Sequence, residues 1–251
     1  MAIELYHEVH GSSGADSTPL LLIHGGGSTI ETNWGALLPL LAKTRQVIAV
    51  ELQGHGRTPS TDRLPTFEHS ADDVAALLRK LDLGPVDLLG FSNGGNVALR
   101  LSMRHPTLVR RQVIASAFFR REGMVDGFWE GMMAGSIADM PQVYLDADAA
   151  LNPDPAHQQQ LFDLDSGQMK RFEDWPESDL TAVGTPTLIL AGDRDVVRNS
   201  HTVELASLIP DVRLLIVPGF HGSFLGEVLA AGGDLTAMNL TLPSILRFLD
   251  Q

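Results

Sequence analysis

The chain has 251 residues, which is enough for one large α/β domain, and its 44% hydrophobic and 20% charged content is ordinary for a soluble globular protein. It contains no cysteine, which excludes disulfides, thiol catalysis and metal sites with cysteine ligands. The net charge of −13 is spread along the chain and argues against nucleic acid as a partner.

The sequence carries no sign of export or of membrane insertion. Residues 1–10 lack the basic and apolar regions of a signal peptide. No apolar run approaches the ~20 residues that span a bilayer. We therefore expect a cytoplasmic protein with no membrane partner.

Short apolar runs alternate with amphipathic segments along most of the chain. Residues 2–10 alternate between apolar and polar side chains and predict a half-exposed edge strand. Buried strands are predicted at 19–23, 46–52, 86–89, 109–117, 187–191 and 212–217. Helices are predicted at 34–42, 66–81 with Thr66 as the N-cap, 96–103, 199–208 and 240–249. This alternation predicts an α/β fold, in which a mostly parallel central sheet has helices on both faces.

Residues 120–182, here called the cap segment, interrupt this alternation. They are rich in Met, Phe, Trp, Asp and Pro and show no strand pattern. We expect a helical insertion above the carboxyl edge of the sheet, where ligands bind in this architecture. The core domain would then consist of residues 1–119 and 183–251.

The pattern Gly-x-Ser-x-Gly lies between the strand at 86–89 and the helix at 96–103, with Ser92 at its centre. A serine at the tip of such a turn has strained backbone angles, and side chains at positions 90 and 94 would collide with it. The pattern is weak evidence alone, because glycine is common in this chain, but the flanking strand and helix are the context it requires. Ser92 is therefore the candidate nucleophile, and an idle serine in a glycine-rich turn is the alternative.

A serine nucleophile needs a base, and the base needs an acid that orients it. Among nine histidines, His221 is best placed, because it follows the strand at 212–217 in a loop. The acid should also follow a strand, and both Asp193 and Asp195 follow residues 187–191. We favour Asp195, which lies further along the turn towards the His221 loop, and expect Asp193 to cap the turn.

The motifs together resemble those of the α/β-hydrolase superfamily, in its small single-domain serine hydrolase and esterase branch with a helical cap. The matching segments are residues 24–27 (HGGG), 54–57 (GHGR), 90–95 (GFSNGG), 192–195 (GDRD) and 218–221 (PGFH). The resemblance implies an α/β-hydrolase fold with Ser92 as nucleophile, Asp195 as acid and His221 as base. It also implies an oxyanion hole made by the backbone N–H groups of Asn93 and Gly26, with Gly27 as the alternative to Gly26.

The chain departs from the family pattern in two regions. Around the GHGR segment, Glu51 stands where relatives usually have Asp and Thr58 where they often have Ser, both away from the chemistry. After His221 a Gly/Ala-rich stretch runs to Met238, whereas relatives usually enter the last helix sooner. The second departure affects the shape of the chain near the base, and with it the substrate.

Apolar residues near the carboxyl edge are candidates for substrate binding. Met124, Phe128 and Met132 have helical spacing in the cap segment, which predicts either the cap's own core or an adaptable wall of the acyl pocket. The full set of candidates is Gly27, Phe91, Phe118, Phe128, Met132 and Phe220.

The remaining motifs indicate no cofactor and no metal. No histidine pair has metal-ligand spacing such as H-E-x-x-H, and there is no Walker loop. Residues 25–30 fail the pattern G-x-G-x-x-G because position 30 is Ile. We expect His24 to brace the oxyanion loop by hydrogen bonding and His55 to be structural.

The sequence thus predicts a cofactor-free serine hydrolase that cleaves a small, largely apolar carboxylic ester through an acyl-enzyme. The same triad serves lactone opening, C–C bond hydrolysis, acyl transfer and peracid formation, and these remain alternatives. A small-molecule receptor on a hydrolase scaffold is the alternative from another class. A small-molecule ester or lactone is the expected partner, and the oligomeric state stays open.

Overall fold

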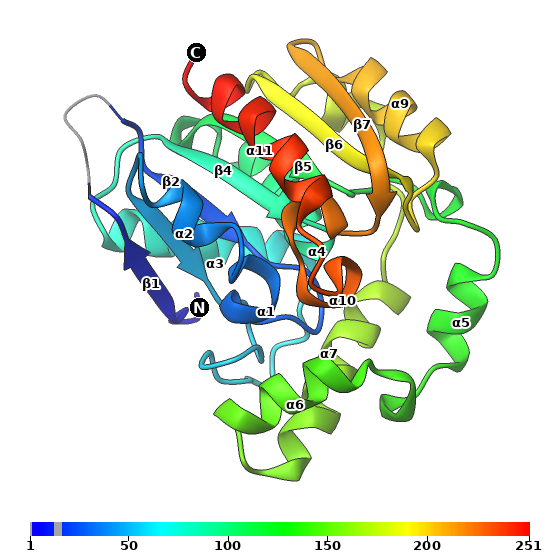
Figure 1. Ribbon diagram of the computed structural model, residues 1–251. Coiled ribbons are helices and arrows are strands. Elements are labelled where there is room, and N and C mark those ends of the chain that lie inside the picture. The colour runs from blue at the N-terminus through cyan, green and yellow to red at the C-terminus, as the bar shows by residue number, and fades with distance from the viewer. Residues whose placement is uncertain (1, 13–16) are drawn as a thin grey trace.

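A computed structural model describes residues 2–12 and 17–251, and its centre is a seven-stranded sheet (Figure 1). The strand order is β1-β3-β2-β4-β5-β6-β7, and only β1 is antiparallel to its neighbour. The strands are β1 His7–His10, β2 Leu20–Ile23, β3 Val47–Val50, β4 Val86–Phe91, β5 Val109–Ala115, β6 Thr187–Arg194 and β7 Val212–Phe220. The predicted mostly parallel sheet, with an edge strand at its start, is confirmed.

Helices cover both faces of this sheet (Figure 1). One face carries α3 Phe67–Lys80, α4 Asn93–Arg104 and α9 Asn199–Leu208. The other carries α1 Ile30–Trp34, α2 Leu38–Leu41 and α11 Thr236–Leu249, with the short α10 Val228–Ala231 before α11. Within residues 2–12 and 17–251, no helix combines the length and the hydrophobicity needed to cross a bilayer.

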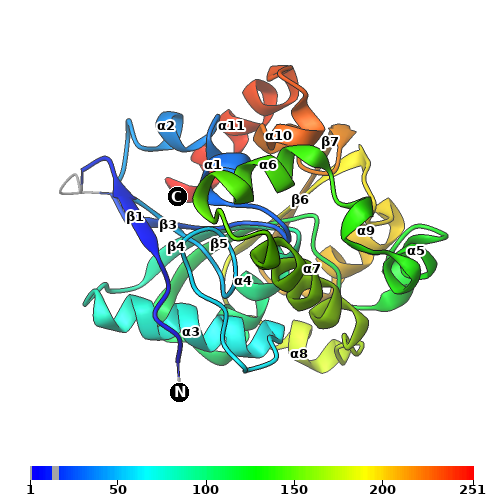
Figure 2. The same ribbon diagram turned by 90° about the horizontal axis from the view of Figure 1, so that it is seen from below.

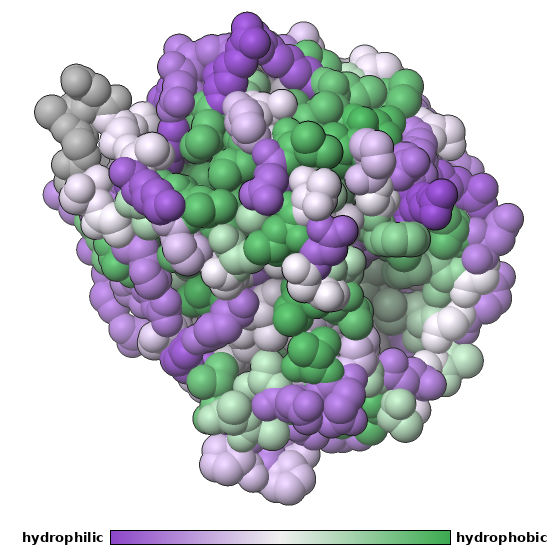
Figure 3. Space-filling model, in the orientation of Figure 1, coloured by the Kyte–Doolittle hydropathy of each residue, from purple (hydrophilic) through white to green (hydrophobic). Residues whose placement is uncertain are grey.

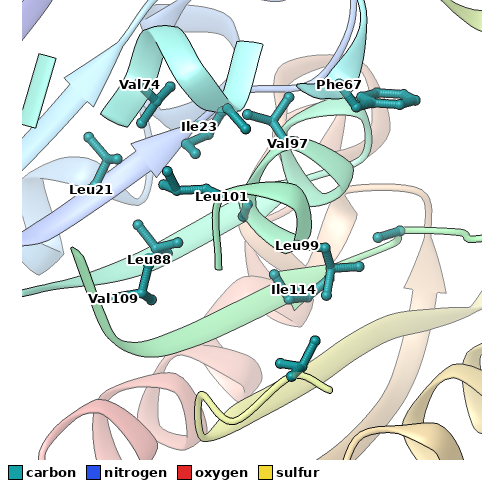
Figure 4. Close-up of a cluster of buried hydrophobic side chains, with 14 of the residues drawn as sticks. Leu21, Ile23, Phe67, Val74, Leu88, Val97, Leu99, Leu101, Val109 and Ile114 are labelled. Atoms are coloured by element: carbon teal, nitrogen blue, oxygen red, sulfur yellow. The ribbon is translucent and has the colours of Figure 1, made fainter. Parts of the chain in front are cut away.

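Two hydrophobic clusters hold the layers together, one on each face of the sheet. Strand β2 contributes to both, since Leu21 and Ile23 pack with α3 and α4, while Leu20 and Leu22 pack with α1, α2 and α11. Figure 4 shows the first cluster, where Leu21 and Ile23 lie near Val74 of α3. Burying one such side chain contributes about 1.5–3 kcal/mol, so a strand buried on both faces anchors the carboxyl edge firmly.

The cap segment lies between β5 and β6 in sequence and is helical. It contains α5 Phe128–Ala134, α6 Gln142–Leu151, α7 Pro155–Lys170 and α8 Glu177–Thr181, with short 3₁₀ turns at Arg121–Gly123 and Ile137–Asp139. In the view from below, α6 and α7 lie in front of the sheet (Figure 2). The division into a core domain and a cap at residues 120 and 182 remains a prediction.

Two predicted helices differ from the structure for local reasons. The helix predicted at 34–42 is divided into α1, which ends at Trp34 with Gly35 as its C-cap, and α2, which begins at Leu38 with Pro39 in its first turn, where proline is tolerated. The Met124–Met132 stripe is not one helix. Met124 pairs with Val197 in an isolated bridge, and α5 begins only at Phe128, after Gly127 with φ +80°. By contrast, the helices predicted at 66–81 and 199–208 are confirmed.

The N-cap of α3 provides a test of the fold's local energetics. The Thr66 hydroxyl accepts a hydrogen bond from the backbone N–H of His69 at 3.1 Å. Replacing Thr66 with Ala should lower the free energy of unfolding by about 1 kcal/mol, because a donor of the first helical turn loses its partner. Urea unfolding measures the change, with the exposed Thr107→Ala as the matched control. Equal stability of the two variants would contradict the capping role.

Candidate active site

Ser92 sits on a turn that has no room for a side chain at position 90 or at position 94. Strand β4 ends at Phe91 and α4 begins at Asn93, which leaves Ser92 between them with φ +54° and ψ −121°. A Cβ at Gly90 would lie 2.2 Å from the carbonyl oxygen of Gly94, and one at Gly94 would lie 2.1 Å from that of Ile23. The glycines are therefore required by backbone contact, and the strained turn holds the Ser92 hydroxyl above the sheet.

Three side chains from the ends of β4, β6 and β7 meet at this turn. The His221 Nε2 lies 3.0 Å from the Ser92 Oγ, and its Nδ1 lies 2.6 Å from the Asp195 Oδ1. An ionised carboxylate only accepts hydrogen bonds, so Nδ1 carries the proton and Nε2 is free to accept from the serine hydroxyl. This tautomer is the one in which His221 can remove the Ser92 proton.

Asp195 is fixed by several donors besides His221. Ser116 donates its hydroxyl to Oδ2, and the backbone N–H of Val197 donates to Oδ1 at 3.1 Å. Burial acts to raise the pKa of Asp195, but the His221 hydrogen bond and charge, with the Ser116 hydrogen bond, bring it below its ordinary value. Asp195 therefore stays a carboxylate facing His221.

Asp193 has a different contact from Asp195. Its Oδ1 accepts a hydrogen bond from the backbone N–H of Gly219 at 2.8 Å. Asp193 thus ties the end of β6 to the end of β7, just before His221, and has no hydrogen bond with the imidazole ring. Of the two carboxylates left open by the sequence, only Asp195 is brought to the histidine.

Beside Ser92 and His221 lies a mainly apolar cavity of about 320 Å³. In the space-filling view a shaded recess bordered mostly by hydrophobic surface lies between the positions of α10 and α5 (Figure 3). The cap segment supplies much of the wall, with Met124, Phe128, Met132, Met140, Tyr144, Phe162 and Met169. Methionine adapts to irregular shapes, so this wall can fit substrates of varied outline.

The cavity includes some of the predicted substrate-binding residues and not others. Gly27, Phe118, Phe128 and Met132 line it, together with Gly26 and Asn93. Phe91 lies beside the His221 ring, with the two ring centroids 4.7 Å apart. Phe220 is 55% exposed and lies near Arg194, outside the cavity. Phe91 therefore supports the histidine ring, and Phe220 has no contact with the space beside Ser92.

The backbone N–H groups near Ser92 differ in whether they already donate a hydrogen bond within the protein. Asn93 is the first residue of α4, so its N–H has no partner within the helix. The Gly27 N–H donates to the Oδ2 of Asp165, a residue of α7, at 2.5 Å. The Gly26 N–H has no hydrogen bond with any described residue. The geometry thus leaves Gly26 and Asn93 available for a ligand oxygen, whereas Gly27 is occupied.

Two histidines behind the Gly25–Gly27 loop have pKa values shifted in opposite directions. The His24 Nδ1 donates to the Gly25 carbonyl at 2.7 Å and Nε2 accepts from the Leu52 N–H at 3.0 Å, which braces the loop as expected. Burial and then the neighbouring His55 lower the pKa of His24 to about 3, so it is neutral. Both ring nitrogens of His55 face acceptors, the Gln53 carbonyl at 3.0 Å and the Asp165 Oδ2 at 3.1 Å, which fits a cation.

Four polar side chains of the cavity were missed from the sequence: Ser116, Tyr144, Asp165 and Ser166. The Tyr144 hydroxyl on α6 donates to the buried Glu227 at 2.8 Å. Glu227 caps α10 by accepting from the N–H groups of Leu229 and Ala230. A signal for Asp165 existed, since it lies four residues from both Leu161 and Met169 and so on the buried face of α7. Ser116 and Tyr144 left no such signal.

The described residues contain no group of three or more His, Asp or Glu side chains arranged to hold a metal ion. Ser116, Tyr144 and Asp165 are instead hydrogen-bonded to other groups of the protein. What the arrangement offers chemically is a hydroxyl beside an imidazole, a buried carboxylate behind it, and two free backbone donors.

The model of the alpha/beta hydrolase family matches residues 20–233. A 2-hydroxymuconate semialdehyde hydrolase of Pseudomonas sp. (strain CF600) is 32% identical over 82% of this chain, and the match spans 57% of that relative's length. A pimeloyl-[acyl-carrier protein] methyl ester esterase of Neisseria meningitidis is 40% identical over 47% of this chain and 44% of its own. A thermophilic esterase from Thermogutta terrifontis shares the fold, with a TM-score of 0.73, 22% identity and coverage of 99% and 95% of the two chains.

The tight contact at the serine turn leads to a stability prediction. Gly94→Ala should lower the free energy of unfolding by about 3 kcal/mol, because its Cβ would overlap a backbone carbonyl of β2 that is not free to move. Gly131→Ala is the matched control, also within a helix but with nothing within 4 Å of the new Cβ, and should raise stability by about 0.5–1 kcal/mol. Thermal and urea unfolding measure both, and similar shifts at both positions would contradict the steric requirement.

Proposed function

Because this chain belongs to the alpha/beta hydrolase family, we propose that it is a serine hydrolase that cleaves a small, largely apolar carboxylic ester through an acyl-enzyme. The observation that carries the proposal is the chain of contacts from Ser92 through His221 to Asp195. In this proposal Ser92 is the nucleophile, His221 the general base and acid, and Asp195 the group that orients the imidazole.

Acylation would begin with attack of the Ser92 Oγ on the ester carbonyl carbon. The His221 Nε2 takes the hydroxyl proton as the C–O bond forms, and the Asp195 carboxylate stabilises the resulting imidazolium. The carbonyl oxygen becomes an oxyanion, which we place on the backbone N–H groups of Gly26 and Asn93. Each such fixed donor typically contributes about 3 kcal/mol to the stability of the transition state.

Collapse of the tetrahedral intermediate then breaks the bond to the alcohol. The imidazolium gives its proton to the departing alkoxide oxygen, which leaves as the alcohol and returns His221 to its neutral form. Water next attacks the acyl-enzyme with His221 again as base, and the second collapse releases the carboxylic acid and restores the Ser92 hydroxyl. Atoms and protons balance with water as the only co-reactant.

The cavity supports a small and largely apolar substrate. Its volume of about 320 Å³ lies at the lower end of the range of ~300–1,000 Å³ that is typical of small-molecule sites. Its wall is mainly methionine and aromatic side chains, and no Lys or Arg is among the described residues that line it. A short acyl or aryl group fits such a space, and a polymer does not.

A second candidate is hydrolysis of a semialdehyde or diketone-like compound, favoured by the similarity to the Pseudomonas 2-hydroxymuconate semialdehyde hydrolase. The similarity to the Neisseria methyl ester esterase favours the ester instead. Lactone opening, acyl transfer, peracid formation and a receptor role share the same scaffold. A hydrolysis panel of aryl esters of increasing acyl length, lactones and a vinylogous diketone ranks these substrates directly.

Ser92→Ala tests the nucleophile. The variant should lose turnover of a short-chain aryl ester by a factor on the order of 10⁶, because no other side chain can form the acyl-enzyme. A fluorophosphonate should label the unmodified protein at one site and should not label the variant. Retained ester hydrolysis in the variant would refute the assignment, and stoichiometric labelling without turnover of any panel member would favour the receptor.

The choice of acid is tested by two matched substitutions at neighbouring positions. Asp195→Asn should lower kcat by about 10⁴-fold, because the amide no longer holds the proton on the His221 Nδ1. Asp193→Asn should leave kcat within about 2-fold, since its amide oxygen still accepts from the Gly219 N–H. Steady-state kinetics on one aryl ester measures both, and a larger loss at position 193 would reverse the assignment.

A further inference from the structure

One charged side chain of the cavity has no part in the proposed mechanism. Asp165 lies on α7 of the cap segment, between the buried residues Leu161 and Met169, and its side chain is 23% exposed. It lines the cavity beside Ser92 and is the only acid among the described lining residues. A carboxylate in a mainly apolar cavity is costly to desolvate, so its contacts need an explanation.

The protein holds one oxygen of this carboxylate from two sides. Oδ2 accepts from the Gly27 N–H at 2.5 Å and from the His55 Nε2 at 3.1 Å. Burial acts to lower the pKa of His55 and to raise that of Asp165, but their mutual attraction and hydrogen bond reverse both shifts. Both shifts favour the charged forms, so the contact favours an ion pair with His55 behind the loop and Asp165 on the cavity side.

The other oxygen has no such partner. Oδ1 makes no hydrogen bond with any described residue, although Asp165 lines the cavity. The carboxylate also lies close to the proposed oxyanion loop, since a Cβ at Gly26 would lie 3.1 Å from Oδ2. Asp165 is thus held at Oδ2, has no hydrogen bond at Oδ1 among the described residues, and lies in the wall of the cavity that also contains Ser92.

This arrangement selects among substrates by charge and hydrogen bonding. A hydroxyl or amine near the scissile carbonyl can donate to Oδ1, and a hydrogen bond to an ionised acceptor is stronger than a neutral one. A carboxylate in the same place meets a like charge, with no Lys or Arg among the described lining residues to offset it. An unsubstituted ester leaves the free oxygen without a partner.

We propose that Asp165 is a specificity-determining residue that recognises a hydroxyl or amino group close to the scissile carbonyl and disfavours a carboxylate there. The inference rests on the proposed esterase function and names its substrate class as hydroxy- or amino-substituted esters. Asp165 binds the substrate and takes no part in bond making. His55 and Gly27 position it.

Four esters test the proposal in the unmodified protein. Phenyl butanoate is the reference, phenyl 3-hydroxybutanoate carries the donor on the acyl side, 3-hydroxyphenyl butanoate carries it on the alcohol side, and monophenyl succinate carries a carboxylate. One of the two hydroxylated esters should exceed the reference in kcat/KM by about 10-fold or more, and monophenyl succinate should fall below it by a similar factor. Ratios near one for both hydroxylated esters overturn the proposal.

Substitutions at position 165 assign these preferences to the carboxylate. Asp165→Leu should bring the hydroxyl ratio to near one, and Asp165→Asn should relieve the penalty on monophenyl succinate, because the amide is neutral. Asp163→Asn is the matched control on the same helix, since Asp163 is exposed and bonds only to Gln159, and it should keep the ratios of the unmodified protein. A hydroxyl preference that survives in Asp165→Leu overturns the proposal.

The reference ester separates this inference from the function on which it rests. Hydrolysis of phenyl butanoate without discrimination among the four esters refutes the role of Asp165 and leaves the esterase intact. Failure to hydrolyse any of the four refutes both. The ratios in the unmodified protein decide the outcome even where a variant fails to fold.

Discussion

Backbone crowding at the end of β4 is the constraint on which the rest of the site depends. The turn at Ser92 is closed on both sides, with the carbonyl of Gly94 over position 90 and the carbonyl of Ile23 over position 94. No residue with a Cβ fits at either position, so both must be glycine. The turn between β4 and α4 therefore fixes the direction of the Ser92 hydroxyl. The proposed catalytic geometry therefore depends on the packing of β2 against β4 and α4.

The turn after β5 has the same backbone arrangement as the turn after β4. Ser116, which follows β5, also has a positive φ of +53°, and its N–H donates to the Leu190 carbonyl of β6 just as the Ser92 N–H donates to the Ala115 carbonyl of β5. Each serine thus extends the sheet ladder by one bond before the chain turns. The first presents a hydroxyl to His221, and the second presents one to Asp195, so neighbouring strand ends hold opposite ends of one hydrogen-bonded chain.

Most of the fold and part of the site could be predicted from sequence, because they depend on local signals. Apolar runs located the strands and Thr66 marked the start of α3. The cavity wall could not be derived in this way. Asp165 and Gly27 are hydrogen-bonded although they are 138 residues apart in the sequence, and only the tertiary fold brings them together. Phe91 was wrongly predicted to line the cavity because it is adjacent to Ser92 in the sequence. Side chains alternate between the two faces of a strand, and this places the Phe91 ring against His221 instead.

The hydrogen bond from Tyr144 to Glu227 connects two parts of the chain that sequence keeps far apart. Burial and the nearby carboxylate raise the pKa of Tyr144, so the hydroxyl keeps its proton and remains a donor. Glu227 caps the N-terminus of α10, which follows His221 after one 3₁₀ turn. Moving α6 away from Glu227 must therefore either break this bond or pull on the segment that follows His221, so the cap segment and the proposed base are mechanically coupled.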